Sequence, residues 1–156
     1  MSYDFKIENG DIALAGGTAA TVDGADKLAQ DVRLWLSEPL GTDRFNPGFG
    51  TSLADAIGGP SSKVAAMVAR GEAMRVMNLY QATQAQKIAR EKWSYMTSYA
   101  PPVAMPLSLE EIVKDVAVDA EPAGSVLRLA VRATTWSGAE VVVGQSINFY
   151  RAQGGR

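Results

Sequence analysis

The sequence predicts an α+β fold, in which an N-terminal β-hairpin and amphipathic helices precede a C-terminal antiparallel β-meander. Three patterns in the chain of 156 residues carry this prediction. Short apolar runs flank Asn9-Gly10, and apolar residues recur at helical spacing over residues 23–37 and 61–99. The last third alternates apolar and polar residues, which is typical of a sheet with one face in water. We expect a single domain over residues 1–150 and a flexible tail at 151–156.

The first element is the hairpin around Asn9-Gly10. Phe5 and Ile7 precede this pair and Ile12 and Leu14 follow it, so the apolar residues on each side are spaced two apart. Both central residues of a type I′ turn need a positive φ, which Asn and Gly adopt most readily. The sequence therefore predicts two short antiparallel strands joined by this turn.

The second element is an amphipathic helix that begins after Asp23 as N-cap and is ended by Pro39 and Gly41. Apolar residues at spacings of three and four form one face: Ala25, Leu28, Ala29, Val32, Trp35 and Leu36. The solvent side is expected to carry Asp26, Lys27, Gln30, Asp31 and Arg33. Leu34 projects away from the apolar face. It is either exposed or covered by the hairpin, or it contacts another subunit.

The ten residues from Gly41 to Gly50 combine three glycines and a proline with two phenylalanines and an adjacent pair of opposite charges. Each Phe gains about 1.5–3 kcal/mol when it leaves water, so a solvated linker rarely carries two. The sequence therefore predicts a fixed loop with both rings packed. We single out as candidate partner-binding residues Asp43, Arg44, Phe45, Pro47 and Phe49.

A short helix is expected from Ser52 to Ile57, and a long helical region follows from about residue 61 to 99. As one helix the long region would measure about 55 Å. It carries one track of closely packable residues, namely Val64, Met67, Val68, Gly71, Ala82, Ala85, Ala89, Trp93 and Met96. A second track carries Met74, Met77, Ile88, Tyr95 and Tyr99. Either a kink near residues 81–84 folds both tracks into one core, or the second track, with Met77, meets a partner.

The C-terminal third is expected to form a meander of antiparallel strands. Turns are predicted at Pro122-Ala123-Gly124 and at Ser137-Gly138. The inward positions are Val116, Val118, Leu127, Leu129, Val131, Ala133, Val141, Val143, Ile147 and Phe149. The last strand, Val141 to Phe149, is our candidate edge strand for pairing with another chain, with Val141 and Val143 as site residues. The alternative is that the N-terminal hairpin covers this edge.

Composition narrows the possible functions. The formal net charge is −2 and the chain holds neither Cys nor His. Thiol chemistry is therefore excluded, and the commonest general base and transition-metal ligand are missing. No phosphate-binding glycine motif and no long apolar run is present. We expect no metal, no cofactor, no nucleic acid and no membrane as partner.

Catalysis is also disfavoured by the acidic residues near the loop, which are Glu38, Asp43 and Asp55. Glycoside hydrolysis needs two carboxyl groups at a set separation, one of them with a raised pKa. A cation near Asp43 would lower the pKa of its carboxyl group instead, and Arg44 is adjacent in sequence. We therefore expect a protein that is not an enzyme.

The loop Asp43-Arg44-Phe45-Asn46-Pro47-Gly48-Phe49-Gly50, placed directly after an amphipathic helix, resembles that of the small inner wedge subunits of contractile tail baseplates. This family includes the W-type baseplate proteins of tailed phages, also labelled lysozyme-like, and the matching subunits of type VI secretion and related injection machines. The resemblance extends to the Asn9-Gly10-Asp11 turn, to residues 51–58 and to the strand-rich C-terminal third, in the same order. Asp43 departs from the Glu that is usual in the family.

The resemblance implies a structural virion protein of the tail baseplate, assembled in the host cytoplasm and present in several symmetric copies. Its implied partners are other wedge proteins, the tail sheath protein, and the tail tube or hub. Arg44 would face a neighbouring wedge subunit, or satisfy backbone carbonyls within the domain. The last strand would seed the first sheath ring by strand exchange. The alternatives are a peptidoglycan hydrolase of the tail, and a structural protein of a non-contractile tail or connector.

Overall fold

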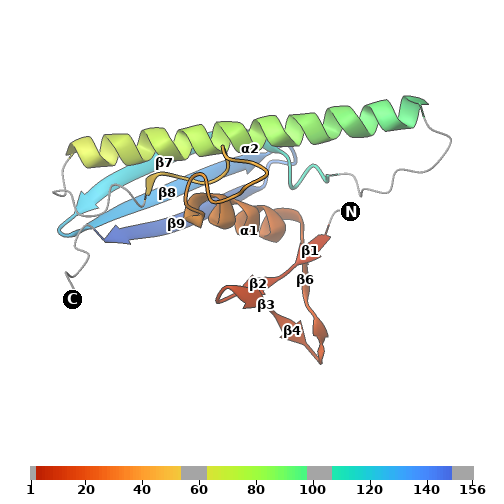
Figure 1. Ribbon diagram of the computed structural model, residues 1–156, viewed down its shortest axis with the longest axis horizontal. Coiled ribbons are helices and arrows are strands. Elements are labelled where there is room, and N and C mark those ends of the chain that lie inside the picture. Colours follow the sequence, from red (N-terminus) through yellow and green to blue (C-terminus); the bar gives the residue numbers. More distant parts are fainter. Residues whose placement is uncertain (1–2, 54–62, 98–106, 149–156) are drawn as a thin grey trace.

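The structure is a computed structural model, and it describes residues 3–53, 63–97 and 107–148. Six short strands are followed by two helices and a three-stranded antiparallel sheet, so the predicted α+β class is confirmed. Both helices lie on one face of the sheet, and the short strands project from the other side of the first helix (Figure 1). Most of the expected helix at 52–57 lies outside the described residues, and so does the whole of the expected tail at 151–156.

The N-terminal strands form three two-stranded arms. They pair as β1 (Tyr3–Phe5) with β6 (Thr21–Asp23), β2 (Ile7–Glu8) with β3 (Asp11–Ile12), and β4 (Leu14–Ala15) with β5 (Thr18–Ala19). The turn between β2 and β3 has φ values of 54° at Asn9 and 84° at Gly10, so the predicted hairpin is confirmed. The sequence analysis missed the second turn at Gly16-Gly17 and the return strand β6.

The three arms meet at a closed triangle of backbone hydrogen bonds. The N–H groups of Lys6, Ala13 and Ala20 donate in turn to the carbonyls of Ala20, Lys6 and Ala13, each at 2.8 Å. Nearly every residue of this region is exposed, including the large apolar side chains of Tyr3, Phe5, Ile7, Ile12 and Leu14. Backbone pairing rather than a hydrophobic core therefore defines this part of the chain.

Helix α1 (Gly24–Ser37) follows directly, with Asp23 as N-cap in an extended conformation but without a side-chain capping bond. Leu28, Val32 and Leu36 are buried, so the predicted apolar face is confirmed. Lys27 and Gln30 were expected in solvent, yet each is only 8% exposed. Lys27 can be buried because its ammonium group forms ion pairs with two carboxylates. Gln30 is buried because its side chain forms hydrogen bonds with the N-terminal strand region.

Helix α2 (Lys63–Thr97) is one unbroken helix of 35 residues, so of the two alternatives the kink near residues 81–84 is wrong. Its buried side consists of Ala66, Ala69, Ala73, Val76, Met77, Tyr80 and Gln84. Of the two predicted tracks only Met77 lies in this stripe, because the three buried alanines carry a weak apolar signal. Met77 is completely buried in the chain's own core, so it is not available to a partner. Residues 85–90 are exposed, and α2 extends beyond the end of the sheet (Figure 1).

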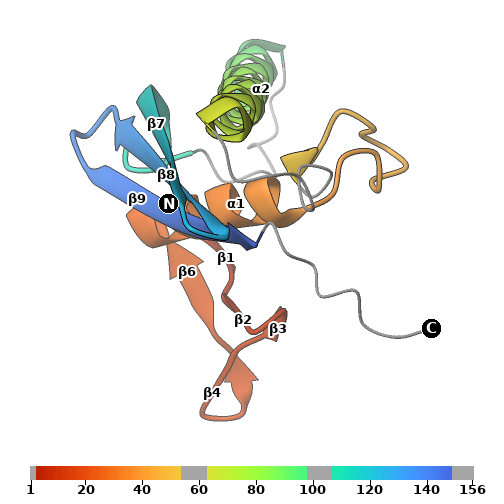
Figure 2. The same ribbon diagram turned by 90° about the vertical axis from the view of Figure 1, so that its left-hand side faces the viewer.

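The sheet consists of β7 (Val113–Ala123), β8 (Val126–Thr135) and β9 (Glu140–Asn148) in that order. Its inner face is buried and its outer face is wet, as the alternation predicted. The β7–β8 turn is shorter than expected, because Pro122 and Ala123 still pair with Leu127 and Val126. Helix α2 packs mainly against β7 and α1 against β9 (Figure 2).

A buried charged cluster joins both helices to the segment before β7. Lys27 Nζ lies 3.4 Å from Asp31 Oδ2 and 3.2 Å from Glu111 Oε2. Tyr80 donates to Asp31 Oδ2 at 3.0 Å, and Ser108 donates to Glu111 Oε1 at 2.9 Å. Burial alone would lower the pKa of Lys27, but the two carboxylates outweigh it and raise that pKa. The ammonium is therefore charged throughout the physiological range.

Replacing Lys27 with Met should lower the free energy of unfolding by about 3 kcal/mol, because the Glu111 carboxylate would remain buried without its counter-charge. Urea unfolding followed by tryptophan fluorescence measures this loss. The double variant Lys27→Met/Glu111→Gln should lose less than the sum of the two single variants. Additive losses would mean that the two side chains do not interact.

Candidate functional site

The base of the 41–50 loop is clamped by backbone bonds between its two ends. Thr51 N–H donates to the Glu38 carbonyl at 2.8 Å, and Leu40 N–H donates to the Thr51 carbonyl at 3.0 Å. Gly50 has a φ of +91°, and a Cβ there would stand 2.6 Å from the Glu38 carbonyl oxygen. Only glycine fits this position. Gly50, the last residue of the loop, therefore allows the two ends of the loop to approach each other.

Two charged residues of α2 hold the same base from the side. Arg75 binds Glu72 through two hydrogen bonds of 2.9 and 2.8 Å, and it donates to the Gly50 carbonyl at 2.8 Å. Glu72 also accepts the Ser52 N–H at 2.8 Å. The hydrogen bond from Arg75, followed by that from Ser52, lowers the pKa of Glu72 to about 2. The sequence analysis missed both residues, because nothing in α2 alone indicates that they reach the loop.

An aromatic cluster anchors the second half of the loop. The Phe49 ring lies 4.7 Å from the Trp35 ring in an edge-to-face arrangement, and Trp35 lies 5.3 Å from Tyr80 in the same way. Phe49 is therefore half-buried at the end of the core, and its predicted packing is confirmed.

The tip of the loop behaves differently from the prediction. Asp43 accepts the N–H groups of Phe45 and Asn46 at 2.8 and 3.2 Å, which forms a local turn. This turn directs Phe45 outward, and its side chain is 96% exposed rather than packed. Arg44 and Pro47 are also exposed, and within the described ranges Arg44 forms no hydrogen bond or ion pair. The expectation that Arg44 satisfies carbonyls of its own domain is thus not met.

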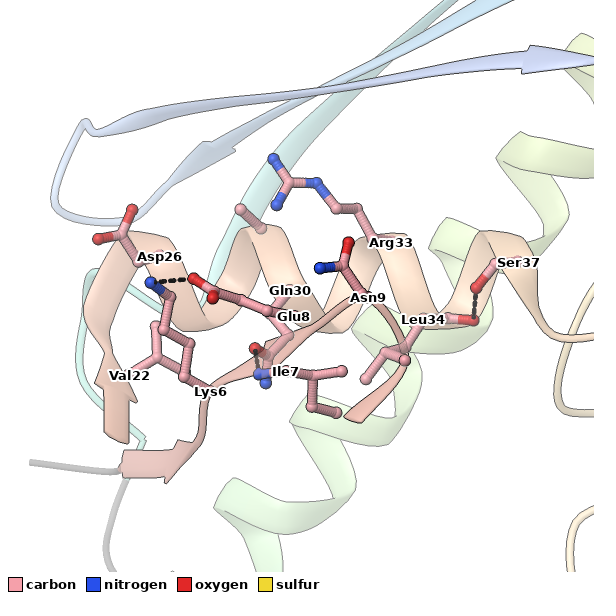
Figure 3. Close-up of a pocket in the computed structure, with 12 residues that line it drawn as sticks. Lys6, Ile7, Glu8, Asn9, Val22, Asp26, Gln30, Arg33, Leu34 and Ser37 are labelled. Atoms are coloured by element: carbon pink, nitrogen blue, oxygen red, sulfur yellow. Dashed lines mark hydrogen bonds and ion pairs between the residues drawn. The ribbon is translucent and has the colours of Figure 1, made fainter. Parts of the chain in front are cut away.

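A second surface lies between α1 and the arm formed by β2 and β3. Gln30 bridges the N-terminal chain by accepting the Ile7 N–H and donating to the Phe5 carbonyl, each at 2.8 Å. A groove of about 570 Å³ opens beside it (Figure 3). Leu34 lies in the wall of this groove opposite Ile7 and remains 38% exposed. The arm therefore partly covers Leu34, and the question of a subunit contact there stays open.

The third surface is the outer edge of β9. Among the described strands β9 pairs only with β8, and none of β1 to β6 adds to it. Val141 and Val143 are buried beneath α1, so this strand can offer a partner its backbone but not these two side chains. Phe149, at the end of the predicted strand, lies outside the described residues.

Residues 3–53, 63–97 and 107–148 contain neither a candidate metal-binding cluster nor a candidate membrane-spanning helix. No group of three or more Asp or Glu residues there is arranged to hold a metal ion. No helix in this part of the chain is long and apolar enough to cross a membrane. Two ion pairs among these residues join different elements of the fold, Lys27 with Glu111 and Arg132 with Glu140.

Comparison with known proteins identifies the fold. No family model matches the chain, and neither does any curated protein. Among solved structures, one from Geobacter sulfurreducens, named "putative tail lysozyme", aligns with a TM-score of 0.56 and 14% identity. The alignment covers 86% of this chain and 99% of the other. The two proteins share a fold. At this identity the likeness carries no residue-level assignment.

The two loop phenylalanines should respond differently to replacement by Ala. Phe49→Ala removes a half-buried ring that contacts Trp35, so we expect a loss of about 2–3 kcal/mol in unfolding free energy. Phe45→Ala removes a ring that is already in water, so its effect should stay within about 0.5 kcal/mol. Thermal unfolding of the two variants side by side tests this. Equal destabilisation would mean that Phe45 packs in solution.

Glu72 should make stability depend on acid pH. Its folded pKa of about 2 lies below its ordinary value of 4.5, so the carboxylate stabilises the fold above about pH 5. This contribution is lost as the pH falls from about 5 towards 2. Glu72→Gln should therefore be less stable than wild type at pH 7, and the two should converge near pH 2. Urea unfolding at a series of pH values measures the difference, and a constant gap would contradict this role for Glu72.

Proposed function

We propose that this chain is a structural subunit of a contractile tail baseplate, in the inner wedge, and that it links the wedge to the first ring of sheath. The observation that carries the proposal is the loop, whose base is clamped while its tip holds Arg44 and Phe45 in water. A loop fixed in this way loses little conformational entropy when it docks. The planar guanidinium of Arg44 suits paired carboxylate or carbonyl acceptors on a neighbouring subunit.

The shared fold supports the association with a tail. The structure named "putative tail lysozyme" aligns over almost its whole length, and this name associates that protein with a tail. We extend this setting to the present chain, because the order of hairpin, helix, loop and sheet also resembles the wedge family.

The edge of β9 provides the proposed contact with the sheath. An edge strand presents N–H and C=O groups that can pair with a strand from another chain. Because Val141 and Val143 are occupied in the core, the pairing would depend on backbone hydrogen bonds. Such contacts tolerate changes in the side chains of the incoming strand.

A hydrolytic role fits the described carboxylates less well. Asp43 already accepts two backbone N–H groups, and Glu38 accepts the Thr42 hydroxyl at 2.7 Å. Glu72 is held by Arg75 with a lowered pKa, which is the wrong direction for a general acid. Asp55 lies outside the described residues. We therefore favour a structural role over the lysozyme activity in the neighbour's name, and also over a non-contractile tail, which has no sheath to meet the β9 edge.

Arg44→Ala should leave the monomer as stable as wild type but block its incorporation into tails, because Arg44 contacts nothing described in its own chain. Electron microscopy of particles from producing cells measures incorporation, and thermal unfolding of the purified chain measures stability. Arg128→Ala is the matched control, because Arg128 is also exposed but lies on the outer face of β8. It should give complete tails.

Two results would contradict this proposal. Complete sheathed tails with Arg44→Ala would remove the loop from assembly. Clearing of a peptidoglycan suspension by the purified wild-type chain, abolished by Asp43→Asn, would replace the structural role with a hydrolytic one.

A further inference from the structure

The outer face of α2 carries apolar side chains that remain exposed among the described residues. Val64, Met67 and Val68 are 68%, 72% and 58% exposed, and Gly71 continues the same face one turn further on. Arg75 and Asn78 then interrupt the face, which resumes towards the C-terminal end with the exposed residues Ala82, Ala85 and Ala89. We call the seven apolar residues of this face the outer stripe. They span about 38 Å of helix.

The outer stripe lies opposite the part of α2 that packs on the sheet. The buried residues run from Ala66 to Gln84 on one side, and the view close to the helix axis places the sheet and α1 together on that side (Figure 2). Three large apolar side chains at spacings of three and four, all in water, are unusual for a surface without a partner. They match the arrangement by which one helix packs against another.

Gly71 is a second feature that the isolated fold does not explain. A glycine within a helix costs about 1 kcal/mol relative to alanine. A Cβ at Gly71 would meet no heavy atom within 4 Å, so nothing in the described chain requires the missing side chain. A glycine beside Met67 and Val68 instead leaves a shallow notch in which the backbone of a second helix can approach closely.

Charge indicates what kind of helix would bind. From Lys63 to Arg90 the helix holds five basic residues, Lys63, Arg70, Arg75, Lys87 and Arg90, and one acidic residue, Glu72. Glu72 is already bound by Arg75. The whole chain nevertheless has a net charge of −2, so α2 is a basic element in an acidic protein. Two copies of this face would bring like charges together, which disfavours self-association.

We propose that the outer stripe docks an amphipathic helix of a partner protein, with small or aliphatic residues in its contact face and acidic residues along its flanks. The partner's backbone would cross α2 near Gly71, with apolar side chains against Val64, Met67 and Val68. Its carboxylates would meet Lys63 and Arg70, which lie along one flank of the stripe at 100° per residue. The proposal rests on α2 alone and does not depend on the loop, on the β9 edge or on a place in a tail.

The test uses the whole chain and two synthetic helical peptides of about 28 residues. Both carry Ala and Leu along one face, with Glu along the flanks of one peptide and Lys at the same positions of the other. Fluorescence anisotropy should show that the Glu peptide binds at least about tenfold more tightly than the Lys peptide. Its affinity should fall as the salt concentration rises from about 0.05 to about 0.5 M.

Gly71→Leu is the decisive variant, because it fills the notch while improving helix propensity, so the fold should keep its stability. It should weaken binding of the Glu peptide about tenfold or more, and Gly71→Ala should weaken it less. Val142→Glu is the matched control: it changes an exposed apolar residue on the outer face of the sheet and should leave binding unchanged.

Several outcomes would overturn the proposal. One is no binding of the Glu peptide at about 100 µM, and another is equal binding of both peptides or full binding to Gly71→Leu. A dimer that Gly71→Leu dissolves in sedimentation experiments would assign the stripe to a second copy of the chain. Binding to vesicles of anionic and zwitterionic phospholipid, lost in Met67→Glu, would assign it to a membrane surface.

Discussion

Lys27 lies where α1, α2 and the segment before β7 meet, and the way its charge is balanced constrains all three. Asp31 comes from its own helix, Glu111 comes from the segment that leads into the sheet, and Tyr80 of α2 completes the cluster through Asp31. A buried ammonium tolerates only small displacements of its carboxylates, because separation leaves charges without partners in a poorly solvated place. The apolar contacts supply the bulk of the stabilisation, and this cluster determines how the helices sit on the sheet.

The placement of α2 against α1 also positions the 41–50 loop. Once α2 is placed against α1, Arg75 and Glu72 reach the loop base, and Tyr80 supports Trp35 beneath Phe49. The loop therefore depends on a helix that begins after it in the chain. The tip, in contrast, is held by short-range hydrogen bonds such as those that Asp43 accepts from Phe45 and Asn46. The firm base and the exposed tip arise from different interactions.

The sequence was most informative where one local rule decides the structure. Asn9-Gly10 identified its hairpin through the φ values that the turn requires, and the alternation from Leu127 to Ala133 identified a strand with one wet face. The sequence was least informative where a side chain contacts residues that are distant in the sequence. Lys27 looks like a surface residue until Glu111 is brought near, and alanines on α2 face the sheet only because small residues let the helix approach closely.

The 41–50 loop contains one correct and one wrong prediction within a few residues. Phe49 and Phe45 have equal hydrophobicity, and the prediction packed both. Trp35 provides a surface for Phe49, while the Asp43 turn carries Phe45 away from the domain. Hydrophobicity alone cannot distinguish a ring that completes a core from one that is presented to solvent. The backbone geometry of the turn makes that distinction.

The triangle of Lys6, Ala13 and Ala20 has a consequence for how this protein can change over evolutionary time. Its three corners lie seven residues apart and are joined through backbone atoms, so no particular side chain is needed to close it. The β2–β3 and β4–β5 arms each end in a turn, at Asn9-Gly10 and at Gly16-Gly17, and their residues are nearly all exposed. An insertion at the tip of one arm would lengthen that arm and leave the triangle intact. The N-terminal region can therefore vary its reach and surface chemistry while the two-layer core stays the same.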